Sequence, residues 1–149
     1  MRNVRVALWG FGAMGKGMAK LLLSRIGVEI VGVCDRYPAI IGKSIYDLLE
    51  VEQAGRPDIL IVDNIDDALK NTPVDICIVA TDSFVQDVYP KIKHVIQKGV
   101  NVLTIAEEMA YPWAQEPELS RKMDRLAREN KVSILGTGIN PGMMMDLLA

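Results

Sequence analysis

The sequence predicts a doubly wound α/β fold, the Rossmann fold, with about six parallel strands and helices on both faces of the sheet. Short apolar runs alternate with amphipathic stretches along the chain, which is the pattern of repeated strand–helix–strand units. The first apolar run leads into a glycine-rich turn, and the second run ends in an acidic residue about 20 positions beyond that turn. Six such strands favour the order 3-2-1-4-5-6.

The expected strands are apolar runs of four to six residues, at 4–9, 29–34, 59–62, 75–80, 102–106 and 132–136. The expected helices lie between them, at 13–26, 44–50, 65–70 and 117–130, with a last one beginning at 143 and continuing to 149. One more helix is expected to begin at Ser83, where Gln86 completes a capping-box spacing, and to end before Gly99. Pro90 lies inside it and is expected to kink or break it.

Composition restricts the classes of function. The chain has 149 residues, enough for one domain with a sizeable core, and half of them are hydrophobic. Its 17 basic and 19 acidic residues give a net charge of −2, which excludes a strongly basic nucleic-acid module. The apolar runs are too short for a membrane helix. Cys34 and Cys77 lie in apolar runs, which indicates a reducing, cytoplasmic compartment. His94 is the single histidine, so no metal site is expected.

The glycine-rich turn has the pattern G-x-G-x-x-G between a predicted strand and a predicted helix. In such turns the first glycine permits a tight bend, the second lets a pyrophosphate approach the backbone, and the third lets helix and strand pack closely. The start of the helix supplies N–H groups and a positive dipole end for the phosphates. The predicted cofactor-binding residues here are Gly10, Phe11, Gly12, Ala13, Met14 and Gly15.

Asp35 ends the second predicted strand and is expected to accept hydrogen bonds from the adenosine ribose hydroxyls, which favours NAD. Arg36 follows it, and Lys43 lies in the same loop. Either cation can pair with the 2′-phosphate of NADP, so the cofactor is expected to be NAD or NADP.

Loops at the carboxyl ends of the later strands are the other expected ligand-binding positions, because ligands of open parallel sheets bind there. Ala80 and Thr81 are expected to border the nicotinamide half of the cofactor, and the alternative is that this loop only caps the next helix. Glu107 and Glu108 are adjacent, so their carboxylates are expected to point in different directions, with one at the reaction site or both serving as surface charge. The loop at 136–142 contains three glycines, Asn140 and a proline and leads to Met143, which lines either a pocket or the core.

Four segments give the chain a family resemblance: VALWGFGAMGKGMAKLL, VGVCDRYPAIIGKS, NVLTIAEEMAYPW and GTGINPGMMMDLL. They resemble the amino-terminal domain of the 2,4-diaminopentanoate dehydrogenases and related NAD(P)-dependent amine dehydrogenases, which look like an offshoot of the dihydrodipicolinate reductase superfamily. The glycine turn is shared with many dehydrogenases, whereas the two last segments are much more specific.

The resemblance implies reversible oxidative deamination of an amine, diaminopentanoate-like, by hydride transfer to NAD(P)⁺. It implies that Glu107 is the catalytic residue near the reacting amine and that Glu107, Asn140 and Met143 contact the substrate. It also implies a second domain for substrate binding and dimerisation, so that residues 1–149 form the dinucleotide-binding domain of a homodimeric enzyme and are inactive alone.

Two other functions remain open. A reductase of the dihydrodipicolinate type is one, although such reductases have a Gly/Thr-rich segment where this chain has Glu107 and Glu108. A standalone, non-catalytic nucleotide-binding module is the other.

Overall fold

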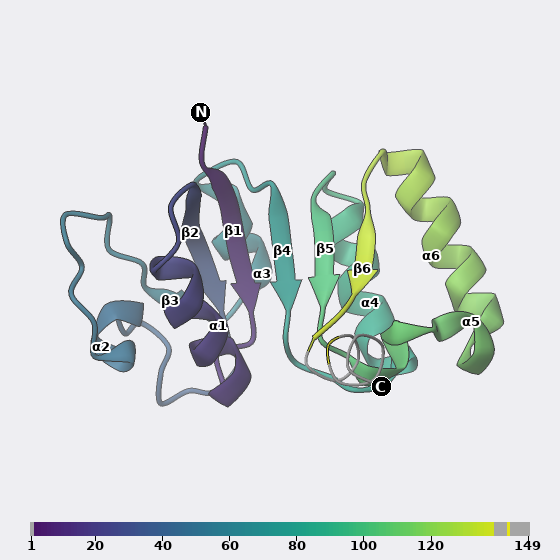
Figure 1. The fold of residues 1–149 in the computed structure, drawn as a ribbon, viewed down its shortest axis with the longest axis horizontal. Coiled ribbons are helices and arrows are strands. Elements are labelled where there is room, and N and C mark those ends of the chain that lie inside the picture. Colours follow the sequence, from purple (N-terminus) through teal and green to yellow (C-terminus); the bar gives the residue numbers. More distant parts are fainter. Residues whose placement is uncertain (1, 139–142, 144–149) are drawn as a thin grey trace. The chain divides into compact units, whose positions relative to one another are not determined.

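A computed structural model of the chain describes residues 2–138 and residue 143 (Figure 1). The chain divides into two compact units, Met1–Asp75 and Ile76–Ala149. The expected helix from 143 to 149 lies largely outside the described residues.

The first unit is a three-stranded parallel sheet with the order β3-β2-β1. Its elements, in chain order, are β1 (Val4–Trp9), α1 (Ala13–Leu23), β2 (Val28–Cys34), α2 (Ile45–Leu49), β3 (Ile61–Val62) and α3 (Ile65–Lys70). The pairing of β1 with β2 shifts register between Val6 and Ala7, and Gly32 then lies against α3, where a Cβ would be 2.2 Å from the carbonyl oxygen of Ala68. A side chain at this position would therefore push α3 away from the sheet.

The second unit is also parallel, with the order β4-β5-β6. Its elements are β4 (Ile76–Val79), α4 (Val85–Ile96), β5 (Asn101–Thr104), the 3-10 helix η1 (Glu107–Ala110), α5 (Pro112–Gln115), α6 (Pro117–Asn130) and β6 (Ile134–Gly136). The helices α4 and α6 pack against each other. The strand orders of the two units are the two halves of the order predicted from the sequence, and the doubly wound α/β class is confirmed.

Helix α4 differs from its prediction at both of the positions that the sequence singles out. It begins at Val85, not at Ser83, and it continues through Pro90 without a break. Five of its side chains are buried, and each contributes about 1.5–3 kcal/mol of burial free energy. Their sum exceeds the cost of about 3 kcal/mol for a proline in a helix. Packing therefore outweighs the missing N–H of Pro90.

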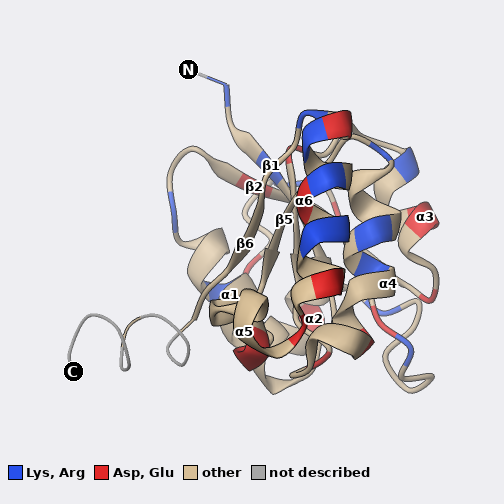
Figure 2. Cartoon of the chain, turned by 90° about the vertical axis from the view of Figure 1, so that its right-hand side faces the viewer, with Lys and Arg blue, Asp and Glu red and all other residues tan. Residues whose placement is uncertain are grey.

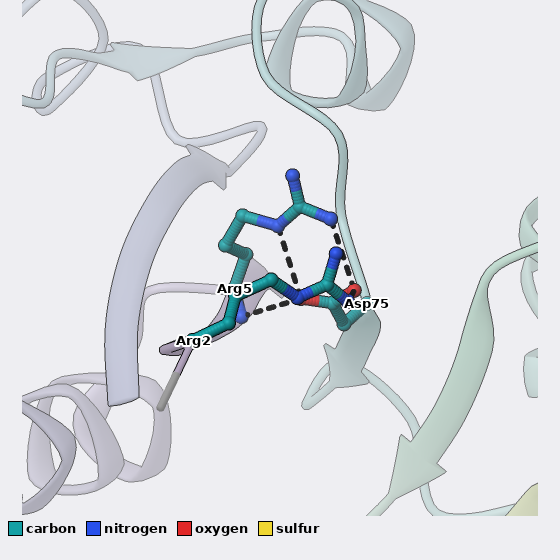
Figure 3. Close-up of polar contacts among 3 residues, drawn as sticks. All are labelled: Arg2, Arg5 and Asp75. Atoms are coloured by element: carbon teal, nitrogen blue, oxygen red, sulfur yellow. Dashed lines mark hydrogen bonds and ion pairs between the residues drawn. The ribbon is translucent and has the colours of Figure 1, made fainter. Parts of the chain in front are cut away.

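The ends of the first unit are joined by an ion-pair cluster (Figure 3). The Arg5 guanidinium donates to both carboxylate oxygens of Asp75, at 3.0 Å each, and the Arg5 backbone N–H donates to Oδ2 at 2.9 Å. Arg2 donates to Oδ1 at 2.7 Å. These hydrogen bonds hold the pKa of Asp75 well below its usual value, with the Arg5 side chain as the main cause.

No described helix has the length and hydropathy that crossing a bilayer requires. Both acidic and basic residues occur along the ribbon of α6 in Figure 2.

Candidate functional site

The glycine turn has the close packing that its pattern predicts. Gly10 has a φ of +105°, in the region that favours glycine, and its N–H donates to the carbonyl of Cys34 at 2.8 Å. A Cβ on Gly15 would be 2.1 Å from the carbonyl oxygen of Gly10, so only glycine lets α1 start this close to β1. The turn is thus fixed by backbone contacts at both of these glycines.

Gly12 lies in a different environment. It is the N-cap of α1, its φ is −73°, and a Cβ built on it would have nothing within 4 Å. Neither strain nor crowding within the described chain requires a glycine here. Gly12, Ala13 and Met14 are all exposed, and the first turn of α1 carries no acidic side chain. This exposed helix start suits an anion that approaches the backbone closely.

Asp35 follows β2 and accepts a hydrogen bond from the backbone of the glycine turn. Its Oδ2 accepts the backbone N–H of Phe11 at 2.5 Å, and its Oδ1 accepts the backbone N–H of Tyr37 at 2.8 Å. Each carboxylate oxygen has a second lone pair, so the group retains acceptors for ribose hydroxyls. The Phe11 ring is fully buried, so only the backbone of Phe11 is available to a ligand. Arg36 is exposed beside Asp35.

In the second unit, the loop after β4 is held by a lysine that the sequence analysis does not single out. The Lys91 ammonium donates to the Thr81 hydroxyl at 2.9 Å and forms an ion pair with the Asp82 carboxylate. The Lys91 and Asp82 side chains are 24% and 19% exposed, so the pair is shielded from water on most sides. Lys91 lies inside α4, and its long side chain extends toward the N-terminus of the helix, where it meets this loop.

Ser83 and the two glutamates form a second cluster. The expected capping box of Ser83 and Gln86 is not formed, because the N-cap of α4 is Phe84 and no side chain at the cap accepts from the helix. The Gln86 amide donates to the Glu116 carboxylate at 2.5 Å. The N–H of Val85, at the start of α4, donates to Oε2 of Glu108 at 2.8 Å. The N–H of Glu108 donates to the Ser83 carbonyl at 3.2 Å. The cap of α4 therefore comes from η1 and not from the preceding loop.

The adjacent carboxylates have different partners, as expected. Glu108 is half-buried and caps α4, whereas Glu107 is exposed. A hydrogen bond with the Ser83 side chain, followed by one with its own backbone N–H, lowers the pKa of Glu107 from its usual value. Glu107 is thus a carboxylate at neutral pH, with a charge available to a cation.

Residues of β5 and β6 fix the position of η1. The buried Thr104 hydroxyl accepts the N–H of Ala106 at 3.2 Å, just before η1 begins. A Cβ on Gly136 would be 2.2 Å from the carbonyl oxygen of Met109, so β6 must have glycine where η1 packs on it. The four-residue η1 is held by its neighbours.

Ala80, Asn140 and Met143 are the other predicted site residues. Ala80 is half-buried after β4, and Met143 is 50% exposed, with its N–H donating to the Gly138 carbonyl at 3.1 Å. Asn140 lies outside the described residues. Within the described residues, no group of three or more His, Cys, Asp or Glu side chains is placed to hold a metal ion.

The second unit also has a cavity of about 520 Å³, lined by parts of η1, α5, α6 and β6. Trp113 and Met123 are among its lining residues, and Glu107 is not. No sequence pattern indicates this cavity, since η1 and α5 are not among the elements expected from the sequence.

Comparison with known proteins identifies several similar chains, although no protein-family model matches. The 2,4-diaminopentanoate dehydrogenase of Acetoanaerobium sticklandii is 50% identical over 148 residues, which is 99% of this chain and 41% of that protein. The solved amine dehydrogenase of Mycobacterium smegmatis is 36% identical with a TM-score of 0.83, over 91% of this chain and 39% of that one.

A third solved structure, GenD2 from gentamicin A biosynthesis in complex with NAD, is 23% identical with a TM-score of 0.64, over 91% of this chain and 34% of that one. At this identity the likeness shows a shared fold only. The chain spans about two fifths of the length of the curated dehydrogenase that it matches. The resemblance predicted from the sequence is therefore confirmed: over almost its entire length, this chain is similar to 2,4-diaminopentanoate dehydrogenase and to an amine dehydrogenase.

Proposed function

We propose that this chain is the NAD(P)-binding domain of an oxidoreductase that reversibly deaminates an amine. The observation that carries the proposal is the environment of Gly12. It lies at an exposed helix start, and a Cβ built on it would have nothing within 4 Å. The open space leaves room for a ligand to reach the N–H groups at the start of the helix. A dinucleotide pyrophosphate is the anion that this type of turn binds.

The cofactor contacts follow from the first unit. The N–H groups at the start of α1 bind the pyrophosphate, and Asp35 accepts the ribose hydroxyls through its remaining lone pairs. The Asp35 charge opposes a 2′-phosphate, whereas the exposed Arg36 attracts one, so we propose NAD(P) as the cofactor, with a preference for NAD. GenD2, which shares the fold, contains NAD. Ala80 and Thr81 are proposed to contact the nicotinamide half.

The amine chemistry is assigned to Glu107. When bound, the oxidised nicotinamide supplies the acceptor for the hydride that leaves the amine-bearing carbon. The Glu107 carboxylate, ionised at neutral pH, holds the ammonium form of the substrate and takes one proton from it, which gives the neutral amine. Loss of hydride from the amine-bearing carbon then leaves a protonated imine. Water adds to the imine carbon, both water protons pass to the nitrogen, a ketone and ammonium leave, and Glu107 releases its proton to solvent.

The substrate class rests on the diaminopentanoate dehydrogenase similarity, which favours an amine over a dihydrodipicolinate-type substrate. Asn140 and Met143 are proposed as substrate contacts. For the longer protein we propose a further domain that completes the substrate site and forms a homodimer, and a cytoplasmic location. Residues 1–149 alone are proposed to bind cofactor without turnover.

The test is a titration of the 149-residue chain with NADH and, separately, with NADPH, followed by the fluorescence of Trp9. Trp9 is half-buried at the end of β1, next to the glycine turn, so bound cofactor changes its environment. Saturable binding supports the cofactor assignment, and the ratio of the two Kd values measures the selection by Asp35 and Arg36. A folded chain that binds neither cofactor would overturn the assignment.

A further inference from the structure

The loop after β4 contains a hydroxyl whose hydrogen-bond directions are determined by its two neighbours. The Lys91 ammonium donates to the Thr81 oxygen at 2.9 Å, and the Thr81 hydroxyl donates to Oδ2 of Asp82. Lys91 also forms an ion pair with that carboxylate, which closes a triangle of three side chains. An ammonium group only donates and a carboxylate only accepts, so the Thr81 hydroxyl must accept from Lys91 and donate to Asp82.

This arrangement lets Thr81 accept a further hydrogen bond but not donate one. A hydroxyl has one O–H donor and two lone pairs. Asp82 takes the donor and Lys91 takes one lone pair, so one lone pair remains for a partner from outside the described residues. Thr81 is exposed, so such a partner can reach it. The partner must itself carry an N–H or an O–H group.

The surroundings of the triangle stabilise this orientation. The Lys91 and Asp82 side chains are mostly buried, and hydrogen bonds to charged groups are stronger than those between neutral groups. Rotation of the Thr81 O–H away from Asp82 would therefore break a charge-assisted hydrogen bond where water has little access. Lys91 is itself fixed by α4, in which the next residue, Ile92, is fully buried.

We propose that Thr81 is a hydrogen-bond acceptor that recognises a donor on the nicotinamide half of the cofactor, and that Lys91 is the residue that positions it. The proposal rests on the proposed function, which assigns the cofactor to this chain and Thr81 to the nicotinamide half. That half offers two kinds of donor, the N–H₂ of the carboxamide and the hydroxyls of its ribose. Both fit an acceptor that has no proton to give.

Three ligands that share an adenosine diphosphate group distinguish the two donors. ADP lacks the whole nicotinamide half, ADP-ribose adds only the ribose, and NADH adds both the ribose and the carboxamide. Each ligand is titrated into the 149-residue chain and followed by the fluorescence of Trp9. Trp9 ends β1 next to the glycine turn, so it reports on the part that all three ligands share.

The first variant is Thr81→Val, which removes the hydroxyl, retains the branched shape and keeps both partners of the ion pair. Loss of one hydrogen bond is expected to weaken NADH binding by about 2- to 10-fold and to leave ADP binding unchanged. Weaker binding of ADP-ribose as well would assign the donor to the ribose, whereas an unchanged Kd for ADP-ribose would assign it to the carboxamide. An unchanged Kd for NADH, or equal weakening for ADP and NADH, would overturn the proposal.

The second variant, Lys91→Met, tests the positioning role. It keeps most of the side-chain length and removes the ammonium group, so we expect NADH to bind more weakly and ADP to bind as before. The matched control is Lys93→Met, at an exposed position of the same helix, which is expected to leave all three Kd values unchanged. If Lys91 acts through Thr81, Lys91→Met causes no further weakening in a Thr81→Val background. Additive losses in the double variant would contradict positioning through Thr81.

Lys91→Met leaves the Asp82 charge without its partner, which can prevent folding. In that case the double variant Lys91→Met/Asp82→Leu gives the same test, because it removes both charges and frees the Thr81 hydroxyl to rotate. We expect this variant to bind NADH more weakly than the parent and ADP equally well. Parental affinity for NADH in the folded double variant would remove Lys91 from the proposal.

Failure of this inference and failure of the proposed function give different results. A folded parent chain that binds none of ADP, ADP-ribose and NADH would refute the cofactor assignment itself. A parent chain that binds all three ligands, together with a Thr81→Val variant that binds them equally well, would leave the cofactor assignment standing and refute the role of Thr81 as an acceptor.

Discussion

Replacement of Gly12 by alanine tests whether the glycine turn serves a ligand. The backbone at Gly12, with a φ of −73° and a ψ of −159°, is accessible to alanine, and the added Cβ would have nothing within 4 Å. Alanine is a poorer N-cap than glycine by about 1 kcal/mol or less, and the lower entropy of the unfolded chain offsets about 0.4–1 kcal/mol of that. Gly12→Ala is therefore expected to fold with stability close to that of the parent.

Cofactor binding, unlike stability, is expected to weaken in Gly12→Ala. The methyl group would occupy the space through which a phosphate reaches the backbone N–H groups. Loss of one hydrogen bond to a charged group costs about 1.5–3 kcal/mol, which corresponds to a Kd about 10- to 100-fold weaker. Two neighbouring glycines supply controls. Gly17→Ala also has open space but lies beyond the first turn, so it is expected to add about 1 kcal/mol of helix stability and leave Kd unchanged.

Gly15→Ala supplies the opposite control. Its Cβ would overlap the carbonyl oxygen of Gly10, at 2.1 Å, so it is expected to lose about 1–3 kcal/mol or more of stability. The assay is the Trp9 titration with NADH, combined with urea unfolding of each variant. A Gly12→Ala protein that binds NADH as tightly as the parent would show that the open space is not where the cofactor lies, and would refute the reasoning.

Four further outcomes are expected. Glu107→Gln in the full-length enzyme should lower kcat by about 10²-fold or more and spare the Kd for NADH; a normal kcat would remove Glu107 from the mechanism. Gly136→Ala should cost about 1–3 kcal/mol in urea unfolding, because its Cβ would be 2.2 Å from the Met109 carbonyl oxygen, and parental stability would show that η1 can move aside. The lowered pKa of Asp75 means that its contribution to stability is complete above the ordinary value of 3.8 and is lost as the pH falls below it. Asp75→Asn should therefore be less stable than the parent at neutral pH, and the difference in stability should narrow in acid. Asp124→Asn removes the exposed ion pair with Arg128, so its stability should stay close to that of the parent at both pH values. Burial, followed by the nearby Asp35 charge, raises the pKa of the Cys34 thiol to about 12, so disulfide reagents should label Cys34 only after unfolding; rapid labelling of the native chain at neutral pH would contradict its burial.

Sequence patterns predicted the parts of this molecule that depend on local chemistry. The bounds of β1 and α6 agree with the prediction at both ends, because each has a clear periodicity between marked stops. The glycine turn was recognised because each glycine has a separate backbone requirement, of which the structure shows the positive φ of Gly10 and the contact of Gly15.

Features set by contacts between distant residues were not predictable in this way. Strand β3 pairs with β2 through only Ile61 and Val62, half of the apolar run, since pairing depends on the neighbouring strand as well as on hydropathy. The elements η1 and α5 have four residues each, too few for a helical period. The capping of α4 by Glu108 joins two segments that no local pattern connects, so the sequence predicts for Ser83 a role that belongs to Glu108.

The cluster of Arg5 and Asp75 has a consequence for the order of folding. The two residues are 70 positions apart, and the entropy of closing so long a loop in an unstructured chain is substantial. Once β1 has paired with β2, and β2 with β3, the free length between the two residues is far shorter, so their contact forms late. We expect substitutions at Arg5 and Asp75 to have φ-values near zero and to accelerate unfolding while leaving the folding rate almost unchanged. Loss of the ion pair is then expected to shorten the lifetime of the folded first unit, which would be measured as a faster unfolding rate.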